Sequence, residues 1–93
     1  MRKRAVYKIP GGKMVRVALK WEENLIKDIK ITGDFFLYPE EGINFLEDSL
    51  RNVRLEDALE KIKNVVKSNN LTLFGLTPEG IVETIKLAIN KNE

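Results

Sequence analysis

Hydrophobic and polar residues alternate with a period of two along the first third of the 93-residue chain. In residues 13–21, for example, Val15, Val17 and Leu19 share one face, and Arg16 lies on the other. Such alternation is typical of strands with one buried face. We expect strands at residues 5–9, 13–21 and 25–32, with turns at Pro10-Gly11-Gly12 and Glu22-Glu23-Asn24. The pattern predicts a three-stranded antiparallel meander.

The apolar residues of the second half recur at helical spacing instead. A first helix is predicted from Pro39, because proline followed by two glutamates suits a first helical turn. A second stripe runs from Leu55 to Val66 and ends at Asn69-Asn70. A third helix should begin at Thr77, whose hydroxyl can cap it. Residues 71–74 fit either a short strand or an extended connector.

Strands followed by helices indicate one α+β domain over residues 1–93, a two-layer sandwich with three helices packed on one face of the meander. No apolar run approaches the roughly 18 residues needed to span a bilayer. The first residues also lack the apolar stretch of a signal peptide. We therefore expect a cytoplasmic protein that does not enter membranes.

The composition removes many kinds of catalysis, because the chain has no cysteine and no histidine. Disulfides, thiolate nucleophiles, structural zinc, iron-sulfur ligation and imidazole bases are excluded. The few hydroxyl groups lie beside no base that could activate them. The sequence therefore predicts no catalytic residue.

The net charge of +2 conceals an uneven distribution. Residues 1–30 carry nine basic and three acidic side chains, whereas residues 31–60 carry two basic and eight acidic ones. A basic surface can steer a nucleotide, a nucleic acid or an acidic protein, or it can simply keep a sheet face solvated. Most of the aromatic rings lie outside the basic third, which argues against nucleic-acid binding but leaves it as the alternative.

Two short segments could contribute to a site. Pro10-Gly11-Gly12-Lys13 has the glycines and the cation of a phosphate-binding loop, but GxxxxGK[ST] and a following helix are missing. A hairpin turn that presents Lys13 to an anion held by a partner is the more economical interpretation.

The second segment, Gly33-Asp34-Phe35-Phe36, lies near the glutamates Glu40 and Glu41. Three carboxylates could serve acid–base chemistry or magnesium, yet Asp34 suits a turn in which its side chain bonds nearby amides. We expect a strand end, a Gly-Asp turn and then a helix start. If the backbone stays extended, one of Phe35 and Phe36 faces the core and the other faces outward, where it could anchor a partner. The sequence leaves open which one.

Three segments together, KIPGGKMVRV, ITGDFFLYPEEG and LTLFGLTPEGIVETI, resemble the C-terminal accessory domain of lipoate-protein ligase A. In some archaea and bacteria that domain is a separate small subunit. The resemblance covers nearly the whole chain and implies a fold similar to that of sulfur-transfer and iron-sulfur scaffold proteins. The activity of those proteins does not transfer, because it needs cysteine.

The resemblance implies a heterodimer with a separate catalytic subunit that binds lipoate, ATP and magnesium, none of which this chain would bind alone. The pair would form lipoyl-AMP and acylate a lysine of lipoyl-domain carrier proteins. Residues of this chain would organise the complex without catalysing the reaction. The partner-facing turn would be Pro10, Gly11, Gly12 and Lys13, and the second motif Gly33, Asp34, Phe35 and Phe36.

Overall fold

A computed structural model describes residues 1–91 and contains the predicted meander. Its strands are β1 (Arg2–Lys8), β2 (Met14–Glu22) and β3 (Leu25–Gly33), paired antiparallel in the order β1-β2-β3. The alternating apolar side chains lie on the inner face and are buried. Glu22, expected in the second turn, is the last residue of β2, because Glu23 and Asn24 alone adopt the positive φ angles that close a two-residue hairpin.

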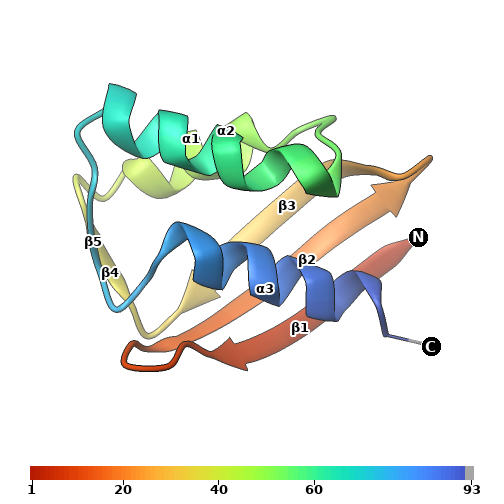
Figure 1. The fold of residues 1–93 in the computed structure, drawn as a ribbon, viewed down its shortest axis with the longest axis horizontal. Coiled ribbons are helices and arrows are strands. Elements are labelled where there is room, and N and C mark those ends of the chain that lie inside the picture. Colours follow the sequence, from red (N-terminus) through yellow and green to blue (C-terminus); the bar gives the residue numbers. More distant parts are fainter. Residues whose placement is uncertain (92–93) are drawn as a thin grey trace.

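Three helices cover the inner face of this sheet (Figure 1). They are α1 (Gly42–Ser49), α2 (Leu55–Ser68) and α3 (Pro78–Ile89). Helix α3 packs on β1 and β2, α1 packs on β3, and α2 packs against both other helices. The expected α+β two-layer architecture is confirmed. No described helix is long and apolar enough to cross a membrane.

The start of α3 agrees with the prediction, whereas the start of α1 does not. The hydroxyl of Thr77 accepts a hydrogen bond from the Gly80 amide at 2.9 Å, as a capping residue should. Helix α1 begins at Gly42, three residues after Pro39. The backbone amide of Gly42 bonds to the Pro39 carbonyl at 2.9 Å, so Pro39, Glu40 and Glu41 form a turn ahead of the helix.

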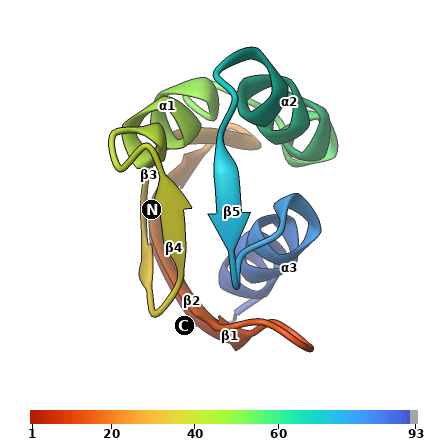
Figure 2. The ribbon, with the colours of Figure 1, turned by 90° about the vertical axis from the view of Figure 1, so that its left-hand side faces the viewer.

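The late start of α1 reflects a second sheet that local patterns did not reveal (Figure 2). Strands β4 (Phe36–Tyr38) and β5 (Thr72–Phe74) pair antiparallel, with Phe36 opposite Phe74. Residues 71–74 thus include a short strand, and a strand also separates the Gly-Asp turn from α1. Because Tyr38 is held extended by pairing with Thr72, the chain must turn before a helix can form.

Candidate functional site

The Pro10–Lys13 segment is the tip of the β1–β2 hairpin. The Gly12 amide donates to the Ile9 carbonyl at 2.8 Å, and the Ile9 amide donates to the Lys13 carbonyl at 3.1 Å. Gly11 has φ +73°, which glycine adopts without strain. A strand follows the turn, so its geometry is that of a hairpin and not of a phosphate-binding loop.

This turn rests on the segment that follows β5. The Lys13 amide donates to the Gly75 carbonyl at 2.9 Å. A Cβ atom on Gly12 would lie 2.9 Å from that carbonyl oxygen, and a Cβ atom on Gly75 would collide with the Lys13 side chain. The two loops approach this closely because both contact positions are glycine. Gly75 was not among the predicted site residues.

The second motif, residues 33–36, also contacts the start of β2, directly after the hairpin turn. The Asp34 amide donates a hydrogen bond to the carbonyl of Met14, the residue that follows Lys13, at 3.0 Å. A Cβ atom on Gly33 would collide with that carbonyl oxygen. We expected the side chain of Asp34 to bond nearby amides, but within residues 1–91 the bond at this turn comes from its backbone amide. Asp34 itself is exposed.

The structure also decides the orientation of the two phenylalanines. Phe35 is half-buried and packs against the core, whereas the Phe36 side chain is 74% exposed. The opposite-face expectation is therefore confirmed, and Phe36 is the outward ring. A hollow of about 310 Å³, lined in part by both rings and Glu40, lies between the end of β3, β4 and the start of α1.

Phe36 belongs to a larger exposed group, which we call the aromatic face: Phe36, Tyr38 and Phe74, exposed by 74%, 71% and 55%. The three rings share the outer side of the β4–β5 sheet, while Leu37 and Leu73, which pair with each other, pack against the core. Tyr38 and Phe74 were missed. The alternation in Phe-Leu-Tyr and Thr-Leu-Phe was the available signal, but each run has only three residues.

The three segments quoted for the family resemblance thus meet at one end of the molecule. Backbone hydrogen bonds join the hairpin turn to Gly75 and the Gly-Asp turn to Met14, and strand pairing joins β4 to β5. Large exposed aromatic side chains grouped beside ordered loops are typical of protein interfaces. This end of the molecule is therefore the candidate functional site.

The carboxylates of this end do not assemble into a metal or acid–base site. Asp34, Glu40 and Glu41 are all exposed. Among residues 1–91, no group of three or more acidic side chains could hold a metal ion. No buried side-chain nitrogen or oxygen in the described part of the chain lacks a hydrogen-bond partner. The acid-site interpretation of these residues therefore finds no support.

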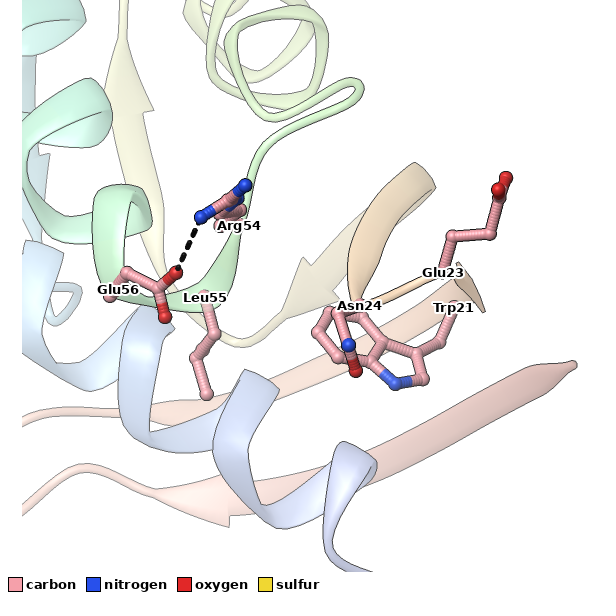
Figure 3. Close-up of a pocket in the computed structure, with 6 residues that line it drawn as sticks. All are labelled: Trp21, Glu23, Asn24, Arg54, Leu55 and Glu56. Atoms are coloured by element: carbon pink, nitrogen blue, oxygen red, sulfur yellow. Dashed lines mark ion pairs between the residues drawn. The ribbon is translucent and has the colours of Figure 1, made fainter.

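Another hollow, of about 430 Å³, lies at the opposite end, between the β2–β3 turn and the start of α2 (Figure 3). Trp21 and Leu55 supply apolar surface, and Arg54 pairs with Glu56 at 3.9 Å. Both charged side chains are mostly exposed, and exposed pairs contribute little energy. This hollow has no converging polar groups of the kind that define a ligand site.

The contact between the two loops yields a stability prediction. We expect Gly11→Ala to cost about 1 kcal/mol of unfolding free energy, because alanine at positive φ is strained in otherwise open space. Gly75→Ala has nearly the same φ, +76°, but must also displace Lys13, which should cost about 1–3 kcal/mol more. Urea denaturation of both variants measures the difference. Equal losses of unfolding free energy in the two variants would show that the two loops are not in close contact.

Comparisons with known proteins extend the resemblance. The family model described as "Bacterial lipoate protein ligase C-terminus" matches residues 3–85. The chain is 36% identical over 77 residues to "Lipoate-protein ligase A subunit 2" of Thermoplasma acidophilum, covering 80% of this chain and 78% of that protein. It is also similar to a chain in the solved structure of a bipartite lipoate protein ligase and its E2 lipoyl domain from the same organism. That similarity has a TM-score of 0.73 and 34% identity, over 91% of this chain and 92% of the other.

Proposed function

The chain belongs to the family of lipoate protein ligase C-terminal domains, and we propose that it is the accessory subunit of a two-part lipoate-protein ligase. The observation that carries the proposal is its match, over most of both lengths, to a relative that is itself a second subunit. The convergence of the three family-like segments at one exposed end supports it. The alternative of a nucleic-acid-binding module receives no support from these comparisons.

The partners follow from the same assignment. A separate catalytic subunit would dock on this chain, and lipoyl-domain carriers would be the proteins modified by the pair. The related archaeal system comprises a bipartite ligase and an E2 lipoyl domain. The aromatic face fits the role of an anchor, since central aromatic side chains contribute much of the energy of protein interfaces.

We assign both chemical steps to the catalytic subunit. A carboxylate oxygen of lipoate attacks the α-phosphorus of ATP and pyrophosphate leaves, which gives lipoyl-AMP. The amine of the carrier lysine then attacks the lipoyl carbonyl and AMP leaves. The chain lacks cysteine and histidine, and residues 1–91 hold no metal-binding group of side chains. As part of the same proposal, we assign the binding of ATP, magnesium and lipoate to the partner.

The accessory subunit would contribute by closing the active site of the catalytic subunit. Docking of a rigid domain over a site excludes water and fixes the geometry of the reactants without donating a reactive group. The hairpin turn would then bring the exposed cation of Lys13 toward the triphosphate. The backbone of that turn is fixed on both sides by hydrogen bonds, which suits a positioning role.

Lipoate-dependent exchange between ATP and labelled pyrophosphate tests the assignment. We expect little exchange with either subunit alone and rapid exchange with both, because adenylation would require this chain to close the active site of the catalytic subunit. Separate addition of preformed lipoyl-AMP shows whether transfer also needs this chain. Full exchange by the catalytic subunit alone, or any by this chain alone, would refute the proposal.

A further inference from the structure

The outer face of the β1–β2–β3 sheet carries no layer of helices (Figure 2). Helices α1 and α3 pack on the inner face, α2 packs against both of them, and the β4–β5 sheet lies at one end of the molecule. The side chains that alternate outward form what we call the open sheet face: Arg2, Arg4, Val6 and Lys8 from β1, Met14, Arg16, Ala18, Lys20 and Glu22 from β2, and Leu25, Asp28, Lys30 and Thr32 from β3. Six of these residues are cations and two are anions.

The strand register places these cations around one small residue. Ala18 lies directly opposite Arg4 on one side and Lys30 on the other. Arg16 and Lys20 flank Ala18 along its own strand and point the same way. A shallow hollow of about 230 Å³ lies beside Ala18, with Arg4, Arg16 and Lys91 among the residues that line it. An acidic side chain entering there would meet several cations at once.

The fold makes little use of these charges. Within residues 1–91, no ion pair involves Arg2, Arg4, Arg16 or Lys30. Of the two acids of the face, Glu22 pairs with Lys20 at 3.8 Å, and Asp28 pairs outside the face with Arg51 at 3.8 Å. Arg2 also lies directly opposite Lys20, and like charges in that position destabilise a sheet. Binding of an anionic partner would neutralise these cations and so reduce the repulsion between them.

We propose, on the basis of the function assigned above, that the open sheet face binds an acidic surface of the lipoyl-domain carrier during transfer. The catalytic subunit is assigned to the aromatic face at the end of the molecule, so this side stays available to the third component. Proteins that bind single-stranded nucleic acid combine cations with stacked rings, and no residue of the open sheet face is aromatic. Complementary charge favours a protein partner and raises the rate of encounter.

The test uses the assembled two-subunit ligase, preformed lipoyl-AMP and the apo E2 lipoyl domain from the organism that encodes this chain. We expect Arg4→Glu with Lys30→Glu to raise the KM for the carrier about tenfold or more, with kcat unchanged. The difference should shrink at high ionic strength, because salt screens exposed charges. Lys61→Glu with Lys67→Glu makes the same change of net charge on exposed positions of α2 and should leave the KM near the wild-type value.

Each remaining outcome has a defined meaning. A KM equal to that of the α2 control overturns the inference, as does a parallel loss of ATP–pyrophosphate exchange, which would assign the face to adenylation. Binding of a random oligonucleotide that the reversal abolishes, with an unchanged KM, would assign it to nucleic acid and also overturn it. If the reversed variant does not fold, Arg4→Gln with Lys30→Gln should raise the KM by a smaller factor. Failure of the accessory function itself appears independently, as exchange by the wild-type catalytic subunit alone.

Discussion

Phe36→Ala will weaken association with the catalytic subunit by about 30-fold, which corresponds to about 2 kcal/mol. The ring is 74% exposed in the isolated chain, and Phe36 lies directly opposite Phe74 in the pairing of β4 with β5. Burial of such a ring against a partner removes a large apolar area from water, and truncation removes that gain. Isothermal titration calorimetry with the separate subunits measures the change in Kd.

The chain offers a matched control for this variant. Phe45, on α1, is 40% exposed and lies outside the aromatic face. We expect Phe45→Ala to leave the Kd within about twofold, since scattered surface substitutions change energies little. Neither variant should lower the melting temperature by more than a few degrees. Equal weakening by both variants, or none by Phe36→Ala, would remove the aromatic face from the interface.

Local patterns were sufficient for the elements whose signals extend over many residues. The meander follows from alternation in three long strands, and the start of α3 follows from a capping threonine before proline. The start predicted for α1 was wrong because Pro39, Glu40 and Glu41 satisfy the same local preferences in a turn as in a first helical turn. Pairing of β4 with a strand more than thirty residues away decided between the two.

The candidate site shows the same division between local and distant information. The hairpin turn and the Gly-Asp step were recognisable from their glycines, and alternation predicted that one of two adjacent rings would face outward. The choice of Phe36 depends on the register with β5. The role of Gly75 depends on its contact with Lys13, 62 positions away in sequence. No local signal carries that information.

Lys13→Ala will lower the rate of lipoate-dependent ATP–pyrophosphate exchange by the complex roughly 100-fold, because a fixed cation beside phosphate oxygens stabilises charge that develops during transfer. Lys13 is exposed, and its backbone amide is held by the Gly75 carbonyl at 2.9 Å. Truncation beyond Cβ leaves those backbone bonds in place, so the unfolding free energy should change by less than about 0.5 kcal/mol. The Kd for the catalytic subunit should also change little.

Lys8→Ala removes the same charge from the other arm of the hairpin and should lower exchange less than about threefold. Lys13→Arg should retain part of the rate, since arginine also binds phosphate but with a different geometry. A positioning cation predicts this order, with wild type first, then Lys13→Arg, and Lys13→Ala last at unchanged stability. If Lys13→Ala lost stability in proportion to activity, or if Lys8→Ala matched it, the turn would serve the fold of this subunit and not the adenylation step.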